Sequence, residues 1–87
     1  MAAYLARIYV SLKPTVNDPQ GLVIADGLRS LGFSEVEGVR AGKYIEVRLT
    51  APDASTAQGR VDAMCDKLLA NPVIETYRFD VEELVPA

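Results

Sequence analysis

The sequence predicts a single α+β domain in which helices cover one face of an antiparallel sheet. Three observations lead to this fold class. Residues 4–13 and 44–50 alternate apolar and polar side chains with the two-residue period of half-buried strands. Asp18 and Asp53 each precede a stretch with apolar residues at helical spacing. The 87 residues are 49% hydrophobic and suit one core, because a chain of this size buries only about 60–65% of its unfolded surface.

The first strand and the first helix are predicted within residues 4–31. Asp18 is the expected N-cap of the helix, and Pro19 suits the first helical position, where its missing N–H costs nothing. The helix is expected to end near Leu31, because Gly32 accepts the left-handed conformation of a helix C-terminus. Gly27, in the middle, indicates close packing. The apolar stripe expected to face the sheet is Ile24, Ala25, Leu28 and Leu31.

The second and third strands are predicted at residues 33–39 and 44–50. Residues 40–43 lie between them and contain a glycine, which permits the tight reversal of a hairpin. The strict alternation of residues 44–50 is typical of a sheet with one face packed on helices.

The second helix and the last strand follow. Asp53 is the expected N-cap, and the helix should end near Ala70, because a residue before proline avoids the helical region and Asn71 precedes Pro72. Residues 73–81 read as the final strand, and residues 82–87 as a tail that frays. The apolar stripe of this helix is Ala57, Val61, Met64, Cys65 and Leu68.

The element order is therefore β-α-β-β-α-β, the ferredoxin-like arrangement with both helices on one face of the sheet. The other face carries amphipathic and charged side chains, namely Arg7, Tyr9, Lys13, Tyr44, Glu46 and Arg48. Tyrosine and arginine are enriched at interface hot spots, so we expect self-association through this face, with Tyr9, Tyr44 and Arg48 in contact. The alternative is a solvated face with cross-strand charge pairs.

Composition narrows the function classes. The chain has no histidine and one cysteine, so most acid–base and nucleophilic arrangements, an intramolecular disulfide and cysteine-rich metal sites are excluded or disfavoured. Cys65 is expected to be a buried structural thiol. A net charge of −3 disfavours nucleic acid as a partner. No apolar run is long enough to span a membrane and no export signal is recognisable, so a cytoplasmic protein is expected.

Polar residues at the predicted turns have structural and functional interpretations. Arg40 and Lys43 flank Gly42 and could hold an anion, although polar turns commonly contain such residues. Asp18 is explained by capping, where its charge meets the helix dipole. Glu75 could pair with a basic group or remain solvated.

Five sequence blocks resemble those of the PurS family, the small subunit of the amidotransferase that makes formylglycinamidine ribonucleotide (FGAM). They are Leu12-Lys13-Pro14, Asp18-Pro19-Gln20-Gly21, Leu31-Gly32-Phe33, Val39 to Glu46 and Leu68 to Tyr77, in the family's order. The similarity extends from Arg7 to Glu82. Asn17 stands where the family usually has an apolar residue.

The resemblance implies a non-catalytic scaffold in de novo purine biosynthesis. Such a subunit joins the glutaminase PurQ to the synthetase PurL, generally as a dimer, and assists ammonia transfer between them. No cofactor is then expected on this chain, and ATP and magnesium belong to the synthetase. The resemblance selects seven residues as partner contacts: Asp18, Gln20, Arg40, Gly42, Lys43, Asn71 and Glu75.

Two other classes share this fold. A stand-alone regulatory domain that binds a small molecule remains open, because fold alone does not fix function. An acylphosphatase-like enzyme would need an early phosphate-cradling loop with a catalytic arginine, and residues 13–18 contain no arginine.

Overall fold

The computed structural model describes residues 1–85, and within them three strands form one antiparallel sheet. The elements are β1 (Ala2–Leu12), α1 (Pro19–Ser30), β2 (Gly42–Ala51), α2 (Ala54–Met64), the π-helical turn η1 (Cys65–Leu69) and β3 (Glu75–Leu84). The predicted α+β class and antiparallel sheet are confirmed. The chain follows the ferredoxin-like order at every element except residues 33–39.

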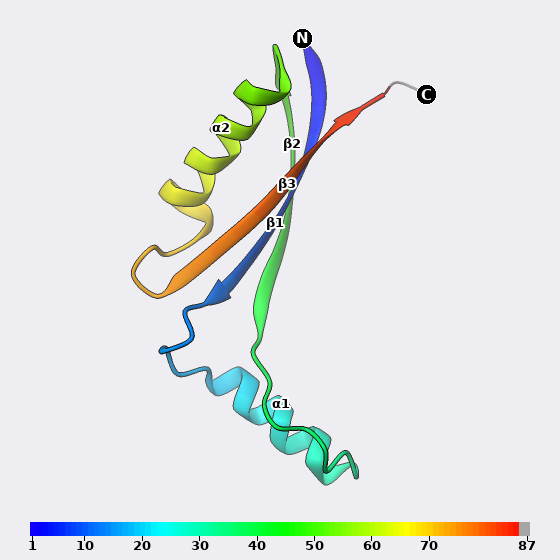
Figure 1. Cartoon of the computed structure of the whole chain (residues 1–87), viewed down its shortest axis with the longest axis vertical. Helices are drawn as coiled ribbons and strands as arrows, with labels where there is room; N and C mark the ends of the chain where they lie inside the picture. Colours follow the sequence, from blue (N-terminus) through cyan, green and yellow to red (C-terminus); the bar gives the residue numbers. More distant parts are fainter. Residues whose placement is uncertain (86–87) are drawn as a thin grey trace.

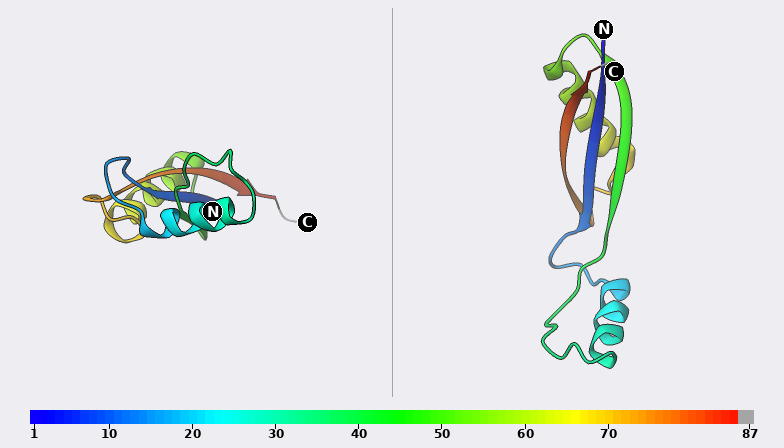
Figure 2. Two further views of the ribbon diagram at one scale, coloured as in Figure 1. Left: turned by 90° about the horizontal axis from the view of Figure 1, so that it is seen from below. Right: turned by 90° about the vertical axis from the view of Figure 1, so that its right-hand side faces the viewer.

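The sheet has β1 at its centre and β2 and β3 at its two edges (Figure 2). Ile8 lies opposite Ile45 of β2 and opposite Phe79 of β3. All three side chains lie on the inner face, which packs against α2. The core therefore forms where the period-two patterns of the three strands coincide.

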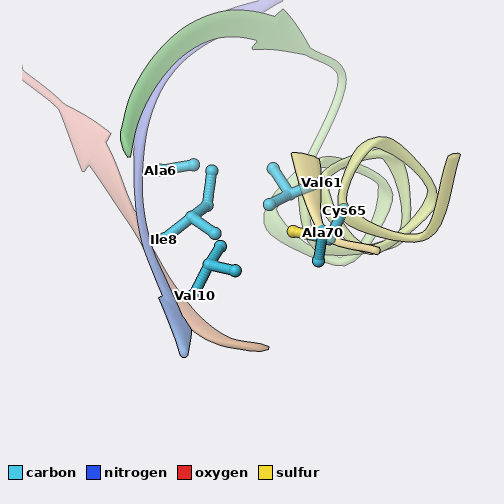
Figure 3. Close-up of a cluster of buried hydrophobic side chains, with 6 residues drawn as sticks. All are labelled: Ala6, Ile8, Val10, Val61, Cys65 and Ala70. Atoms are coloured by element: carbon cyan, nitrogen blue, oxygen red, sulfur yellow. The ribbon is translucent and has the colours of Figure 1, made fainter. Parts of the chain in front are cut away.

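The main core lies between β1 and the α2–η1 helix. Ala6, Ile8 and Val10 point from the curved sheet toward the helix (Figure 3). Val61, Cys65 and Ala70 meet them from the other side. A second buried cluster, of Tyr4, Ala51 and Ala57, fills the end nearer the start of α2. This unit of sheet, α2 and η1 is called the body below.

The second helix ends in a π-helical turn that explains one wrong prediction. The Ala70 N–H bonds to the Cys65 carbonyl at 3.0 Å, an i→i+5 bond that breaks the 3.6-residue spacing. Leu68, predicted in the buried stripe, is 83% exposed. Cys65 is fully buried as predicted, and burial raises the pKa of its thiol.

The strand predicted at residues 33–39 is not formed. This segment runs back along α1, where the Arg29 guanidinium donates to the carbonyls of Val36 at 3.1 Å and Glu37 at 3.2 Å. The predicted hairpin at residues 40–43 is absent for the same reason, since its first strand is missing from the described chain. Arg40 and Ala41 instead lead into β2, which begins at Gly42.

The first helix does not cover the sheet, which corrects the prediction of two helices on one face. It lies beyond the end of the sheet, joined to it by two connecting segments (Figure 1). Of its predicted buried stripe, Ala25 is buried but Leu31 is 77% exposed. Residues 19–41, called the α1 lobe below, lengthen the molecule to 51 × 34 × 14 Å. The radius of gyration is 16.9 Å, against about 12 Å for a compact domain of this length.

Two further predictions fail and two hold. Gly27 has no side chain or backbone close to its Cβ position, so it does not mark close packing. Glu82 to Leu84 belong to β3 rather than to a frayed tail, and residues 86–87 of the predicted tail lie outside the described residues. Gly32 adopts a φ of 101°, as a helix C-terminal glycine should. Asp18 and Asp53 cap their helices as predicted.

Candidate functional site

Most of the predicted site residues gather at the junction between the body and the α1 lobe. Three chain segments meet there: residues 13–18, 38–43 and 71–75. The Lys13 N–H donates to the Ile74 carbonyl at 2.8 Å, which joins the end of β1 to the turn before β3. This junction is where the sheet gives way to the lobe (Figure 1).

Asp18 is the buried centre of the junction. Its Oδ1 accepts the Gly21 N–H at 3.0 Å as an N-cap, and its Oδ2 accepts the Ala41 N–H at 2.7 Å. These bonds, and the nearby charge of Arg40, hold the pKa of the Asp18 carboxyl below its usual value. One carboxylate therefore ties the start of α1 to the segment that leads into β2. Gln20, also predicted, is exposed on the first turn of α1.

Arg40 and Gly42 secure the two connecting segments. The Arg40 guanidinium donates to the Lys13 carbonyl at 2.9 Å, across the two segments. At Gly42, a Cβ atom would collide with the Val10 carbonyl, so only glycine allows this approach of β2 to β1.

Lys43, Glu75 and Asn71 form a second set of contacts on the β3 side. The Lys43 ammonium lies 3.5 Å from Glu75 Oε2, and Glu75 Oε1 accepts the Asn71 N–H at 2.7 Å. Asn71 Oδ1 accepts the Val73 N–H at 3.0 Å and closes the turn. Of the two possibilities given for Glu75, pairing with a basic group or remaining solvated, the structure therefore shows pairing, with Lys43.

These contacts change how the predicted residues are interpreted. Asp18 and Arg40 bond across the segments that join the lobe to the body, whereas Lys43, Asn71 and Glu75 bond to one another within the body. Arg40 and Lys43 each have an internal acceptor, which weakens the interpretation of these two cations as an anion site. Their contact with another subunit stays a prediction.

The outer face of the sheet carries an ordered polar surface. The Tyr9 and Tyr44 rings lie 5.2 Å apart, and the Arg78 guanidinium sits 4.1 Å above the Tyr9 ring. The Tyr44 hydroxyl donates to Glu46 at 2.7 Å, and this bond raises the pKa of Tyr44 to about 12. The alternative interpretation, a face with cross-strand charge pairs, is partly realised.

Arg7 supplies those charge pairs. It lies 3.1 Å from Asp80 and 3.2 Å from Glu82, both on β3. Arg48, on the opposite edge strand, makes no ion pair with any of residues 1–85. Self-association through this face stays a prediction.

Sequence reasoning missed the apolar surface of the α1 lobe. Leu22 is 58% exposed and Val23 is 71% exposed, and we call the exposed apolar side chains Leu22, Val23, Leu31 and Phe33 of the lobe, taken together, the α1 patch. One signal was present, since Leu22 and Val23 fall outside the apolar stripe. A helix that is apolar on several sides is usually buried, whereas these side chains of the lobe are exposed in the single chain.

Two grooves mark the described surface. One, of about 330 Å³, runs between β2 and the α2–η1 helix and is lined by Val47, Arg60, Ala63, Met64, Lys67, Leu68 and Leu69. The other, of about 270 Å³, lies between α1 and residues 37–40. Three of its charged side chains, Asp18, Arg29 and Arg40, are already bonded within the lobe and junction.

Two kinds of feature are absent from the described residues. Within residues 1–85, no cluster of histidine, cysteine, aspartate or glutamate could hold a metal ion. None of the helices in this range is long and apolar enough to cross a membrane. The distinctive features of this part of the chain are the α1 patch, the outer face of the sheet and the junction between the body and the lobe.

Comparison with known proteins decides the family. Residues 5–83 match the family model described as PurS, phosphoribosylformylglycinamidine (FGAM) synthase. The chain belongs to the PurS family. The PurS subunit of Synechocystis is 52% identical over 94% of this chain and 82% of its own length. The PurS subunit of Bacillus subtilis is 48% identical over 94% of this chain and 96% of its own length.

Solved PurS structures share the fold. Thermus thermophilus PurS superposes with a TM-score of 0.85 at 38% identity, covering 95% of this chain and 99% of that one. A chain of the Thermotoga maritima PurLQS structure gives a TM-score of 0.83 at 34% identity, covering 97% and 100%. PurS proteins are subunits of FGAM synthase, an enzyme of purine biosynthesis. The resemblance drawn from the five sequence blocks is confirmed.

Proposed function

We propose that this PurS chain is a non-catalytic bridging subunit of FGAM synthase. It joins the glutaminase PurQ to the synthetase PurL and assists ammonia transfer during the ATP- and glutamine-dependent conversion of formylglycinamide ribonucleotide (FGAR) to FGAM. The observation that carries this proposal is the α1 lobe, which holds an exposed apolar patch away from the body (Figure 1). The related PurLQS structure supports a complex that contains three kinds of subunit.

The exposed area of the chain supports a subunit that works in contact with others. The chain exposes 6141 Å², about 1,100 Å² more than the roughly 5,000 Å² expected of a compact monomer of this mass. A standard protein–protein interface buries about 800 Å² on each partner. The excess is therefore of the size that one such contact would cover.

A bridge suits the chemistry of ammonia transfer. Ammonia released into water becomes ammonium and is lost as a nucleophile, so a contact that excludes water between the two active sites preserves it. In this proposal, ATP and magnesium bind the synthetase subunit, and the PurS chain contributes surface. Asp18 and Asp53 serve as helix caps, and Glu75 accepts the Asn71 N–H at the junction.

The proposal assigns separate surfaces to separate contacts. The α1 patch meets a catalytic subunit, and the side of the sheet that carries Tyr9, Tyr44 and Arg48 serves self-association. The junction residues keep the two surfaces at a fixed relative position. The cytoplasm is the compartment expected for such a complex.

The test compares two nitrogen sources. FGAM formation by purified PurQ and PurL is measured with glutamine and with ammonia, each with and without this chain. The bridging role requires that glutamine-dependent turnover needs the chain while ammonia-dependent turnover does not. Equal glutamine-dependent rates in its presence and absence would overturn the proposal.

A pair of variants locates the contact. Leu22→Ser/Val23→Ser removes apolar side chains from the α1 patch and should lower glutamine-dependent turnover about tenfold at limiting chain concentration, since a few interface residues carry most of the binding energy. Val73→Ser is the matched control, because Val73 is as exposed but lies in the turn before β3. An effect of the control equal to that of the α1 variant would remove the lobe from the bridge.

The stand-alone regulatory domain remains the alternative. A sensor should gain several degrees in Tm with its small-molecule ligand and without any protein partner, because a ligand that binds only the folded state stabilises it. A bridging subunit should respond to PurQ and PurL instead. A screen of small polar metabolites by thermal unfolding separates the two classes.

A further inference from the structure

The outer edge of β3 carries an inference that deepens the proposed bridging role and rests on it. A bridge needs a contact for each of two partners, and the α1 patch supplies one. β3 lies at one edge of the sheet, and its pairing with β1 runs without interruption from Glu75 to Leu84 (Figure 2). Inside residues 1–85, no strand pairs with its other edge. A long edge without a proline or a bulge is a template for pairing with another chain.

The inner side of β3 is anchored to α2 and still leaves apolar surface at the edge. The Tyr77 hydroxyl donates to Asp62 of α2 at 2.6 Å, which holds β3 against the helix. The Tyr77 and Phe79 rings lie 6.3 Å apart, and Phe79 and Val81 are only partly buried. A strand placed beside β3 would bring alternate side chains into contact with these residues, as neighbouring strands do. The inner side of an added strand should therefore be apolar.

The C-terminal half of β3 has an excess of negative charge. Asp80 and Glu82 share one cation, Arg7, and their side chains are still 55% and 57% exposed. Glu83, next along the strand, makes no ion pair with any of residues 1–85. Arg78, the other cation nearby on β3, lies over an aromatic ring of β1. Opposite charges on neighbouring strands are stabilising, so an added strand should carry lysine or arginine on its outer side.

A second copy of β3 does not supply this pattern, because it brings the same excess of carboxylates. Centred on Val81, an antiparallel pair of β3 strands places Asp80 opposite Glu82, and like charges directly opposite are destabilising. Centred on Phe79, the pair draws on Arg78, which is already engaged with the ring on β1. A segment of a different protein, in which lysine or arginine alternates with apolar residues, matches both sides of the edge.

We propose that the outer edge of β3 accepts an extended segment of one catalytic subunit, in which lysine or arginine alternates with apolar residues, as an added strand of the sheet. The main-chain bonds of the edge supply affinity. The basic residues of the segment lie beside Asp80 and Glu82, and its apolar residues pack beside Phe79 and Val81. The bridge then uses two unlike contacts, a charged strand edge and the apolar α1 patch, so each can recognise a different partner.

Hydrogen exchange tests the added strand itself. In the chain alone, the β3 amides that do not bond to β1 should exchange rapidly, because their N–H groups point to the open edge. Mixing the chain with purified PurL, or with purified PurQ, should slow these alternate amides at least about tenfold for one of the two subunits. The β1 amides are the internal reference, because β1 is paired on both sides. Protection of the same β3 amides in the chain alone at rising concentration would assign the edge to a second copy and overturn the proposal.

Charge reversal tests the basic character of the segment. Glu82→Lys leaves the Arg7–Asp80 pair in place and should raise the dissociation constant for the subunit that protects β3 about fivefold, as measured by fluorescence anisotropy. Asp66→Lys makes the same change of charge at an exposed position of η1 and is the matched control, with an expected change below about twofold. Equal effects of the two variants would overturn the basic segment.

The two proposals fail in different ways. A chain that binds neither PurL nor PurQ and is not needed for glutamine-dependent turnover would overturn the bridging role and this inference together. A chain that is needed for that turnover, while its β3 amides exchange at the same rate with and without both subunits, would overturn the added strand alone.

Discussion

The body and the α1 lobe are held together by different forces. In the body, Ile8 and Val61 are fully buried between the sheet and α2 (Figure 3). In the lobe, the buried residues of α1 are the small Gly21 and Ala25, and large apolar side chains such as Leu22 and Leu31 are exposed. The body is therefore stabilised by the hydrophobic effect, and the lobe by hydrogen bonds at its junction and along α1. The body is thus the stable scaffold of the molecule, and the α1 lobe is the part that this scaffold presents to its surroundings.

The largest effect should come from the core of the body. Ile8→Ala removes a fully buried side chain and should lower the free energy of unfolding by about 2–5 kcal/mol, from lost apolar burial and the cavity that remains. Leu22→Ala in the lobe removes an exposed side chain and should change the free energy of unfolding by less than about 0.5 kcal/mol. Urea unfolding followed by circular dichroism measures both. Equal losses would contradict the division into two regions.

The next effect should be confined to the lobe. Asp18→Ala removes the acceptor of two N–H bonds, so the backbone amides of residues 19–41 should exchange with deuterium at least about tenfold faster. The amides of β1 should change little. Asp53→Ala, which removes the cap of α2, is the matched control and should leave the lobe protected. Faster exchange across the whole chain would show that the lobe and body open together.

The same carboxylate predicts a change with pH. The pKa of Asp18 is lower in the folded than in the unfolded chain, so its contribution is present above the ordinary value of 3.8 and is lost as the pH falls below it. The native lobe should therefore lose protection below about pH 4, as measured by hydrogen exchange corrected for intrinsic rates. In Asp18→Asn this acid-induced change should be smaller. An identical acid response in the variant would assign the effect to other carboxyls.

The smallest effect on stability is expected from alanine substitutions at two glycines of α1, which should act in opposite directions. Gly27→Ala should stabilise the helix by about 0.5–1 kcal/mol, because alanine is the better helix former and nothing lies near the new methyl group. Gly21→Ala should destabilise it, because its Cβ would meet the Val39 carbonyl. Hydrogen exchange of the α1 amides measures the difference. A stable Gly21→Ala lobe would mean that the junction has room to relax.

The sequence predicted the body better than the lobe. The alternation of β1 and β2 and the caps at Asp18 and Asp53 are local signals, and each was confirmed. The strand at residues 33–39 failed because its carbonyls bond to Arg29, a contact that no pattern of apolar residues encodes. The stripe of α1 was identified, but periodicity shows only that a face is apolar and not which surface covers it.

The candidate site shows the same limit. Sequence motifs selected Asp18, Arg40 and Glu75, but they could not distinguish a residue that binds a partner from one that holds two segments of its own chain together. That distinction depends on distances, such as the 2.7 Å from Asp18 to the Ala41 N–H. The α1 patch was missed because helical spacing was used to find a buried stripe, and Leu22 and Val23 lie outside it.

The junction also has a topological consequence. Ser11 of β1 lies directly opposite Gly42 of β2, so the chain leaves the sheet and returns to it at neighbouring positions. The whole segment between them is thus an enlarged hairpin loop, and a tight two-residue turn could in principle connect the same strands. The lobe is therefore an insertion in the loop of a β-hairpin formed by β1 and β2. Its length or sequence can change without altering the strand pairing on which the body depends.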